Sequence, residues 1–341
     1  MAVTLAEIAA LAGVSRGTVD RALNDRGRVD PKVAARVRRI AAERGYRPNR
    51  AGRMLARAKN PIRIGVIVQS VETMFMHTVF EEIERASAHF TTTGAEVLVR
   101  PLEGVDAQQQ LDVIDELLEA GVQGIALSPA EDERVRARIQ ELSERMPVVT
   151  FNSDLPDSRR LCFVGQDIYK AGRVAGGLMS RCIPAGSQLL ATVGNLKFDG
   201  HRQRLAGFRD RIREAGFPME DLVVAETFND YETTFRVVTE AIDRYPRLRG
   251  IYMANLSVSG CAAAIEQAGK KGAIRLICHD LNESVRQLLL RGSIDFTIPQ
   301  NLRQQGYGPL ILLRDVLRRK AVPDAARFNR QIDIVCSDNL P

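Results

Sequence analysis

Residues 14–24 read Val-Ser-Arg-Gly-Thr-Val-Asp-Arg-Ala-Leu-Asn, and their spacing indicates a short helix. Ser15 has the short, oxygen-bearing side chain that caps helices, so the helix is expected to begin directly after it. Val19 and Leu23 lie four residues apart and therefore share one face. The stretch predicts a helix with one apolar side that packs inward and one polar side that faces out.

Two further helices are predicted on either side of this stretch. Thr4 followed by Glu7 is a capping-box pattern, and Gly13 supplies the tight turn that ends the first helix. Asp30 and Pro31 begin a third helix, because Asp is a good cap and Pro is tolerated at the first helical position. Two short helices joined by a Gly-containing turn predict a helix-turn-helix, and the third helix closes its small core.

The charge of the chain is unevenly distributed. Residues 1–60 contain 14 Lys and Arg against 5 Asp and Glu, whereas the remainder contains 34 against 37. A basic module on a slightly acidic body is the electrostatic pattern of a nucleic-acid-binding protein. Because the basic segment coincides with the predicted helix-turn-helix, we expect double-stranded DNA to be its partner.

Length and composition predict a soluble cytoplasmic protein. The 341 residues, 45% of them hydrophobic, are enough for two or three domains with sizeable cores. No apolar run approaches 18 residues and no signal pattern opens the chain, so neither membrane insertion nor export is expected. The five cysteines are scattered without a C-x-x-C pair, which is typical of reduced, mostly buried thiols.

Enzymatic motifs are missing from the sequence. There is no H-E-x-x-H, no G-x-x-x-x-G-K-[ST], no G-x-S-x-G and no Cys/His cluster with metal-ligand spacing. We therefore expect no catalytic activity, no metal and no cofactor.

Beyond Pro61 the sequence alternates between apolar runs and amphipathic segments. The runs lack strict alternation of apolar and polar residues, which predicts strands that are covered on both faces, hence parallel sheets flanked by helices. Ten such strands exceed one comfortable sheet, so two lobes are expected. The predicted strands are Ile62–Val68, Glu96–Val99, Gly124–Leu127, Val148–Asn152, Cys162–Val164, Leu189–Val193, Leu222–Ala225, Gly250–Met253, Leu276–Cys278 and Phe296–Ile298. One more strand is expected within residues 331–341.

Three motifs in the N-terminal segment carry a family resemblance. They are Thr-Leu-x-x-Ile-Ala from Thr4, Gly-Val-Ser-x-x-Thr-Val-x-Arg-x-Leu-Asn from Gly13, and Gly-Tyr-x-Pro-Asn from Gly45, which leads to Leu55. In this order they resemble the DNA-binding headpiece and hinge of the LacI/GalR family of bacterial transcription regulators. The rest of the chain is similar to the type I periplasmic sugar-binding proteins, which that family uses as its effector domain.

The resemblance implies the domain organisation. A small all-α helix-turn-helix headpiece (1–46) and a hinge helix (47–60) precede an α/β body (61–341) of two Rossmann-like parallel-sheet lobes, the type I periplasmic-binding-protein fold. Lobe one is expected at about 62–160 and 292–322, and lobe two at about 161–291 and 323–341. Residues 331–341 contain no apolar heptads that would form a tetramer-making zipper, so a homodimer on a pseudo-palindromic operator is implied.

The headpiece is expected to contact DNA in two ways. Arg suits bidentate readout of guanine in the major groove, which makes Arg16 the first choice for a base contact and Arg21 the second. Short polar side chains suit phosphate anchoring, which sets register without reading sequence. The expected DNA-binding residues are Thr4, Ser15, Arg16, Gly17, Thr18, Arg21, Asn24, Arg28, Tyr46, Asn49, Arg50, Arg53 and Leu55.

Two positions leave alternatives open. Asp20 stands where the family usually has Ser; it either repels nearby phosphates, holds Arg16 or Arg21 in place, or accepts from cytosine N4. In the family, the residue matching Leu55 is pushed between base pairs in the minor groove when paired hinge helices fold on the operator. The alternative is that Leu55 packs on the body.

The resemblance also implies an effector cleft at the carboxyl ends of the strands. Phe75 is expected to stack on a sugar ring, with Tyr231 stacking from lobe two, while Arg204 donates to ring oxygen and hydroxyls. Short Asp and Asn side chains would bind adjacent hydroxyl pairs, although strand-end Asp residues often only cap helices. The expected ligand-binding residues are Thr73, Phe75, Asn152, Ser153, Asp154, Arg204, Tyr231, Asn255, Asp280 and Gln300. Asn255 is followed by Leu256, where sugar binders commonly have Asp, so the particular sugar stays open.

The function implied is an allosteric transcription repressor controlled by a small sugar or polyol. Two alternatives keep the same architecture: a purine or phosphorylated metabolite as the effector, or a body that has lost its ligand response and serves only as a dimer scaffold. A purine would favour two stacked aromatic rings, and a phosphate would favour more cationic residues than Arg204 alone.

Overall fold

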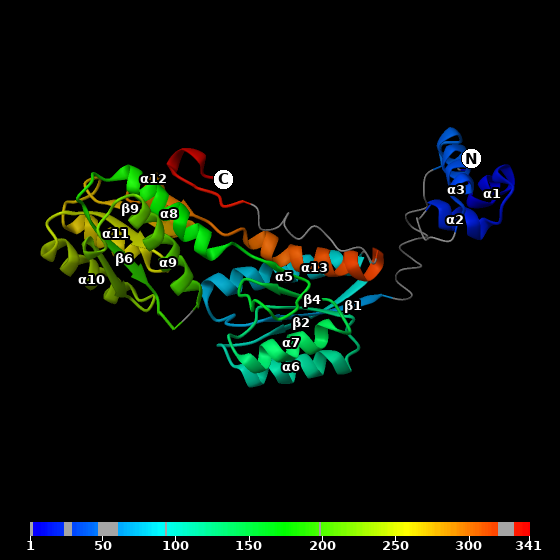
Figure 1. Cartoon of the computed structure of the whole chain (residues 1–341), viewed down its shortest axis with the longest axis horizontal. Coiled ribbons are helices and arrows are strands. Elements are labelled where there is room, and N and C mark those ends of the chain that lie inside the picture. The colour runs from blue at the N-terminus through cyan, green and yellow to red at the C-terminus, as the bar shows by residue number, and fades with distance from the viewer. Residues whose placement is uncertain (1–2, 24–28, 47–60, 93, 198, 320–330) are drawn as a thin grey trace. The chain divides into compact units, whose positions relative to one another are not determined.

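The computed structural model describes residues 3–23, 29–46, 61–92, 94–197, 199–319 and 331–341 (Figure 1). The chain divides into two compact units, the headpiece of residues 1–60 and the body of residues 61–341. The hinge helix expected at 47–60 lies outside the described residues. So do six of the expected DNA-binding residues, namely Asn24, Arg28, Asn49, Arg50, Arg53 and Leu55.

The described part of the headpiece contains the three expected helices: α1 (Leu5–Ala12), α2 (Arg16–Leu23) and α3 (Pro31–Glu43). Thr4 and Glu7 form the predicted capping box, and Gly13 ends α1 in the left-handed conformation with a φ of 60°. Val19 of α2 and Val37 of α3 are fully buried in a small core that all three helices share. The predicted helix-turn-helix with a closing third helix is confirmed.

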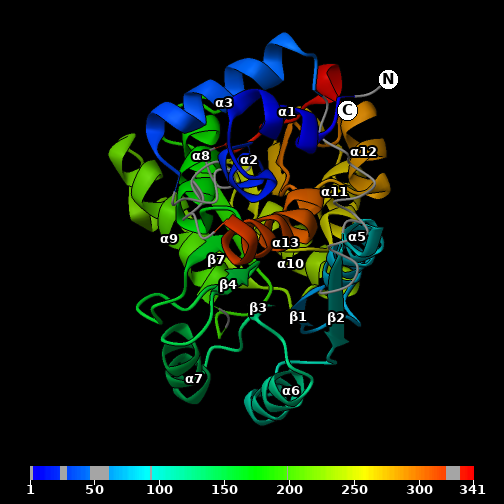
Figure 2. The same ribbon diagram turned by 90° about the vertical axis from the view of Figure 1, so that its right-hand side faces the viewer.

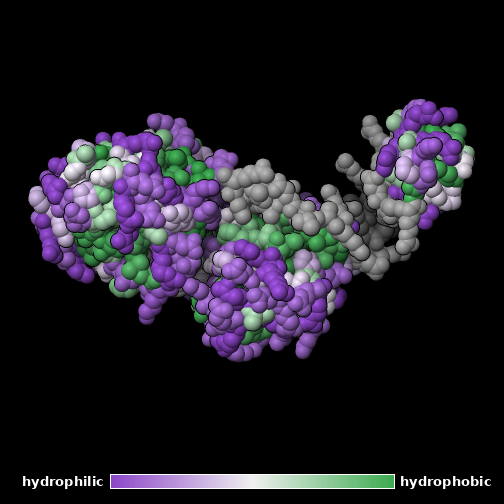
Figure 3. All heavy atoms as spheres, in the orientation of Figure 1, coloured by the Kyte–Doolittle hydropathy of each residue, from purple (hydrophilic) through white to green (hydrophobic). Residues whose placement is uncertain are grey.

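Lobe one of the body is a parallel sheet in the order β2-β1-β3-β4-β5. Its strands are β1 (Ile62–Val68), β2 (Ala95–Pro101), β3 (Gly124–Leu127), β4 (Val148–Phe151) and β5 (Cys162–Val164). Helices α5 (Met74–Thr92) and α13 (Leu302–Arg319) cover one face, and α6 (Ala107–Glu119) and α7 (Glu133–Ser143) cover the other (Figures 1 and 2). The outward surface of α6 and α7 is mainly hydrophilic (Figure 3). Strand β1 is buried from both sides, which explains its uninterrupted apolar run.

Lobe two is built in the same way, with the strand order β10-β9-β8-β6-β7. Its strands are β6 (Gln188–Val193), β7 (Leu222–Glu226), β8 (Leu248–Met253), β9 (Arg275–His279) and β10 (Phe296–Ile298). Helices α8 (Ile168–Cys182) and α9 (Asp199–Glu214) pack on one face, and α10 (Tyr231–Arg244), α11 (Val258–Gln267) and α12 (Glu283–Leu290) pack on the other. A short 3-10 turn, Met219–Asp221, precedes β7.

All ten predicted strands are present, but two of them belong to the other lobe from the one expected. Strand β5 pairs with β4 and completes the sheet of lobe one, whereas 161–291 was assigned to lobe two. Strand β10 pairs with β9 in lobe two, whereas 292–322 was assigned to lobe one. The first two crossovers between the lobes therefore follow β5 and β10, each the last strand of its sheet in chain order.

The C-terminal segment also differs from its prediction. In place of a strand within 331–341, Val335 forms a single antiparallel bridge with Thr297 of β10, and a 3-10 turn follows at Ser337–Asn339. The bridge binds the segment to lobe two beside the carboxyl end of β10.

A candidate DNA-reading face and a candidate effector cleft

Hydrogen bonds between neighbouring side chains order the polar side of α2. Ser15 Oγ accepts from Thr18 N at 3.1 Å, and the Ser15 and Thr18 hydroxyls are hydrogen-bonded at 2.9 Å. Arg21 Nη2 donates to Thr18 Oγ1 at 3.4 Å. Arg16 and Gly17 are exposed at the start of the helix, and the Arg16 side chain has no hydrogen-bond partner within the described headpiece. This side of α2 can offer a guanidinium and hydroxyls to an external acceptor.

Two other expected DNA-binding residues take part in the fold of the headpiece. Thr4 is engaged in the capping box, where its N–H donates to Glu7 Oε2 at 2.7 Å. Tyr46 is half-buried and packs against the headpiece core. A DNA contact by either residue would add to these structural roles.

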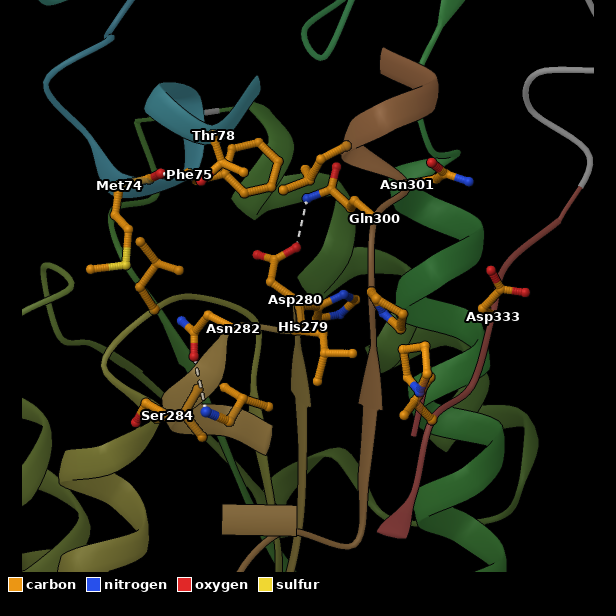
Figure 4. Close-up of a pocket in the computed structure, with 18 of the residues that line it drawn as sticks. Met74, Phe75, Thr78, His279, Asp280, Asn282, Ser284, Gln300, Asn301 and Asp333 are labelled. Atoms are coloured by element: carbon orange, nitrogen blue, oxygen red, sulfur yellow. Dashed lines mark hydrogen bonds between the residues drawn. The ribbon is translucent and has the colours of Figure 1, made fainter. Parts of the chain in front are cut away.

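The body contains a cavity of about 1030 Å³ that both lobes line (Figure 4). Phe75 and Thr78 reach it from the start of α5 in lobe one, Asp280 follows β9, and Gln300 follows β10. Because β9 and β10 are parallel neighbours, their carboxyl ends deliver these two polar side chains to the same place. The structure thus brings together Phe75, Asp280 and Gln300, three of the ten expected ligand residues.

Asp280 is the centre of the polar part of this cavity. Gln300 Nε2 donates to Asp280 Oδ1 at 3.1 Å (Figure 4), and Asp280 N donates to the Ile298 carbonyl at 3.2 Å. Burial raises the pKa of the Asp280 carboxyl, an effect that the positive charge of Arg204 and the Gln300 amide partly offset. Asp280 has a φ of 65°, a strained left-handed backbone for a residue other than glycine.

The cavity lining has a definite chemical character. Besides Asp280 it includes the carboxylate of Asp333 and the amide of Asn301, while none of the described lining residues is Lys or Arg. Phe75 is the only Phe, Tyr or Trp among them. The cavity is therefore suited to a ligand that presents several hydroxyl groups and one apolar face. Its described lining residues offer no cationic side chain to an anionic ligand group.

Other expected ligand residues are engaged with protein partners. In lobe one, Asp154 forms an ion pair with Arg160 and accepts from Thr150 Oγ1 at 2.7 Å. Asn152 Nδ2 donates to Gln305 Oε1 at 3.2 Å, and Ser153 lies between these two residues. None of the three expected residues lines the cavity.

Three more of the expected ligand residues, two in lobe two and one directly before α5, are also engaged with protein partners. Buried Asn255 is hydrogen-bonded to Thr192, Thr227 and Asn229. Tyr231 is 43% exposed at the start of α10, with its ring stacked on Phe235. The Thr73 hydroxyl lies at the start of α5, where it donates to the Ser70 carbonyl at 2.8 Å. These three residues also lie off the cavity lining.

Arg204 lies beside the cavity in the interior of lobe two. Its side chain is buried, Nη1 donates to the Ala254 carbonyl at 3.1 Å, and Nε has no hydrogen-bond partner within the described structure. Two glycines fix the backbone of α9 here. A Cβ on Gly172 of α8 would lie 2.1 Å from the Arg204 carbonyl oxygen, and one on Gly207 would lie 2.0 Å from the Tyr169 carbonyl oxygen. Helices α8 and α9 are thus in backbone contact, and this contact fixes the position of the Arg204 backbone from which the side chain extends.

Several residues line the cavity that sequence reasoning did not select. Asn282 follows β9 as the cap of α12, and its position after a strand was a usable signal. Asp333 and Val335 come from the C-terminal segment, whose return to β10 no local pattern reveals. Met74 and Asn229 also line the cavity without having been selected.

The described residues contain neither a candidate membrane span nor a candidate metal site. No helix among them is long and apolar enough to cross a membrane. Within the same residues no three His, Cys, Asp or Glu side chains are grouped so that they could hold a metal ion.

A helix-turn-helix joined to a two-lobed body with a cleft defines a class of protein, the ligand-responsive DNA-binding regulators. Family comparisons agree with this class. Residues 4–49 match the family of bacterial regulatory proteins named after lacI, and residues 64–321 match the periplasmic binding protein domain. The chain belongs to the lacI family of bacterial regulatory proteins, with a periplasmic-binding-protein body, as the resemblance and the predicted fold class had implied.

Curated relatives and solved structures give the same result. The transcriptional regulator CelR of Thermobifida fusca is 27% identical over 272 residues, 76% of this chain and 75% of that one. The ribose operon repressor of Haemophilus influenzae is 24% identical over 269 residues, 78% of this chain and 77% of that one. Among solved structures, the glucose-galactose binding protein GanP of Geobacillus stearothermophilus matches with a TM-score of 0.67 at 20% identity, covering 83% of this chain and 99% of that one. The last likeness bears on the fold alone.

Proposed function

We propose that this protein is a sequence-specific transcription repressor whose affinity for its operator is set by a small sugar or polyol bound between the two lobes. Membership of the lacI family and the exposed polar side of α2 support the DNA-binding half. The observation that carries the effector half is the Asp280–Gln300 pair, which stands at the carboxyl ends of two parallel strands and lines a cavity shared by both lobes.

The lining of the cavity favours a neutral, hydroxyl-rich effector over the alternatives. A phosphorylated metabolite would need cationic contacts, and the described lining offers Asp280 and Asp333 but no Lys or Arg. A purine would favour two exposed aromatic faces, and among the described lining residues Phe75 is the only Phe, Tyr or Trp, while the His279 ring is 1% exposed and hydrogen-bonded to Tyr252. Carboxylate and amide groups opposite one aromatic face are the usual contacts of a polyol.

We further propose that the regulator acts in the cytoplasm as a homodimer on a pseudo-palindromic operator. Each headpiece offers one short reading helix, and a helix-turn-helix of this size reads one half-site, so two copies are needed for a specific operator. The basic charge of residues 1–60 adds a sequence-independent attraction to phosphates.

A thermal-shift experiment tests the effector half. The purified protein is melted with D-ribose, D-arabinose, D-glucose, D-galactose, myo-inositol, glucose 6-phosphate and adenine in turn. A compound present at a hundred times its dissociation constant stabilises the body by about 2.7 kcal/mol. We expect one neutral compound to raise the midpoint of wild-type protein and not that of Asp280→Asn. A shift with glucose 6-phosphate or adenine alone would overturn the sugar assignment, and no shift with any compound would favour the scaffold alternative.

Selection of bound duplexes from a random DNA pool tests the other half. We expect an enriched pseudo-palindrome, and an affinity for it that falls steeply as salt rises, because many phosphates are neutralised in the complex. A flat salt response or the absence of an enriched sequence would contradict the DNA-binding half.

A further inference from the structure

Three aromatic side chains form a buried column in lobe two that ends at the cavity, where His279 is one of the lining residues. Phe208 of α9, Tyr252 of β8 and His279 of β9 are each at most 1% exposed. The rings of Phe208 and Tyr252 are stacked, with centroids 4.3 Å apart and planes 15° apart. The Tyr252 hydroxyl is hydrogen-bonded to His279 Nε2 at 2.7 Å. The column runs from the helix layer, through the central strand, to the strand that ends at the cavity.

Each end of the column is tied to one charged group beside the cleft. Phe208 lies one helical turn after Arg204 on α9, so stacking of Phe208 fixes that turn of the helix against β8. Arg204 Nη1 donates to the carbonyl of Ala254, two residues after Tyr252. At the other end, His279 directly precedes Asp280 in the chain. The column therefore spans the distance between a buried cation and a half-buried carboxyl group that lines the cavity.

The electrostatics of the column require His279 to be neutral. Burial lowers the pKa of His279 well below its ordinary value, and the positive charge of Arg204 lowers it further, with a partial offset from the Ile298 backbone. Burial raises the pKa of the Tyr252 phenol, so the hydroxyl keeps its proton. A protonated phenol and a neutral imidazole are then joined by one hydrogen bond, in which either the Tyr252 O–H or the His279 Nε2–H is the donor.

Loss of one partner of this hydrogen bond would leave a polar group without a partner in the core. Such a group costs about 1–3 kcal/mol unless the surroundings shift to satisfy it. Asp280 is the adjacent residue that we expect to shift, because its backbone is strained at a φ of 65°. Its side chain is held by Gln300. A shift of His279 would thus be transmitted to the carboxyl group in the cavity.

We propose that Tyr252 and His279 are positioning residues for the effector, because their hydrogen bond, backed by the Phe208 stack, fixes Asp280 relative to Arg204. This inference rests on the proposed function, in which the effector contacts Asp280. It predicts that Tyr252 contributes to effector affinity although its hydroxyl bonds to His279 rather than to the effector.

A double-mutant cycle on effector affinity tests the proposal. Tyr252→Phe, Asp280→Asn and the double variant are titrated by calorimetry with D-ribose, D-arabinose, D-glucose, D-galactose and myo-inositol, well below their melting temperatures. The two variants that carry Asp280→Asn are titrated at higher concentrations of these compounds, because their binding should be too weak to shift the midpoint in the melting experiment. We expect Tyr252→Phe to weaken binding roughly tenfold in the wild-type background and less than twofold in the Asp280→Asn background, since contacting groups are not additive. Tyr169→Phe is the matched control, because it removes a phenol that donates to Asp210 at the surface of the same lobe. Its affinity should equal that of wild type.

Substitution of the other partner provides a second, independent measurement. His279→Gln keeps a hydrogen-bond acceptor for Tyr252 and should bind the same sugar within about threefold of wild type, whereas His279→Leu should lose roughly tenfold. Equal losses for Tyr252→Phe in both backgrounds, or equal affinities for the Gln and Leu variants, would overturn the positioning role. If neither the four sugars nor myo-inositol binds wild-type protein, the sugar-or-polyol assignment fails and this inference fails with it.

Discussion

The headpiece and the body hold their polar side chains in opposite ways. On α2, Arg16 and Arg21 are exposed, and beneath them the packing is provided by small apolar residues of the headpiece core. In the body, Arg204 and Asn255 are buried, and both are hydrogen-bonded to neighbouring strands or loops. The headpiece thus keeps the side chains that we propose recognise DNA apart from those that stabilise its fold, whereas in the body several side chains expected to bind the effector are engaged in stabilising the fold.

This difference has an energetic consequence. Surface substitutions usually change stability by less than about 0.5 kcal/mol, whereas changes in buried networks or tight helix contacts cost several times more. Substitutions on α2 should therefore alter DNA binding at nearly constant stability. Substitutions around Arg204 should alter stability and effector binding together.

The largest effect is expected where α8 and α9 touch. Gly172→Ala places a Cβ 2.1 Å from the Arg204 carbonyl oxygen, a backbone atom that cannot move without shifting α9. Overpacking of this kind costs about 1–3 kcal/mol, occasionally more, and we expect the upper end of that range. The unfolding midpoint of the body should fall by roughly 6–12 °C, at about 2–4 °C per kcal/mol for a domain of this size.

Gly177→Ala on the same helix is the control for this prediction. Its Cβ would meet only the side-chain ends of Arg181 and Arg211, at 3.5 and 3.6 Å. A helical Gly-to-Ala change without a clash stabilises by about 0.5–1 kcal/mol. Similar midpoints for the two variants would show that the α8–α9 contact is not the tight junction that fixes Arg204.

The next effect concerns the headpiece and should leave stability untouched. Arg16→Ala removes the guanidinium best placed to read a base, which costs about 1–3 kcal/mol of discrimination. Thr18→Ala removes a hydroxyl suited to phosphate, so it should weaken binding to all sequences by a similar factor. Both variants are compared with wild type on the selected operator and on random DNA. If Arg16→Ala loses as much affinity for random DNA as for the operator, its assignment as a base contact is wrong.

The sequence carried most of the local structure of both units. Capping residues such as Thr4 and Asp30 form hydrogen bonds within three positions of themselves, so they predict where a helix begins. Continuous apolar runs predicted the strands. Lobe membership was mispredicted for β5 and β10, because periodicity identifies a strand but not the sheet edge that it joins. The physical reason is that strand pairing is a long-range contact.

Prediction of the cavity-lining side chains from the sequence was limited in the same way, because long-range contacts decide which side chains reach the cavity. The family resemblance selected Phe75, Asp280 and Gln300, and the structure places all three at one cavity, where their contact with an effector stays a prediction. It also selected Asp154, whose ion pair with Arg160 depends on how a loop folds back on itself. Asp333 could not be found from sequence, because it reaches the cavity through a chain reversal onto β10.

Asp280→Asn is expected to change stability and effector binding in opposite directions. The variant should be more stable than wild type and should bind the effector less well. Burial raises the pKa of this carboxyl, so its charged form destabilises the folded state at neutral pH. The Asn variant keeps an oxygen to accept from Gln300 Nε2, and it should melt a few degrees higher, a gain of roughly 0.5–2 kcal/mol. It should also lose the sugar-induced shift. The stability gain should vanish in acid below the ordinary pKa of about 3.9, where Asp280 is protonated in both states. A lower midpoint at neutral pH would contradict the cost assigned to the buried charge.

The smallest effect expected is a pH dependence of the body that the headpiece lacks, since all four histidines lie beyond residue 60. Burial lowers the pKa of His279 and of His201, so both remain neutral in the folded state when the unfolded chain takes up protons near pH 6.5. The unfolded state then binds more protons, and stability is full above about pH 6.5 and falls as pH decreases below it. Between pH 7 and 5.5 His279 should account for about 1 kcal/mol, or 2–4 °C in midpoint, and His201 should add to the slope in the same direction. His279→Gln should remove its share of this slope while Asp280 titrates equally in both proteins. An unchanged slope would mean that His279 is not held neutral by its burial beside Arg204.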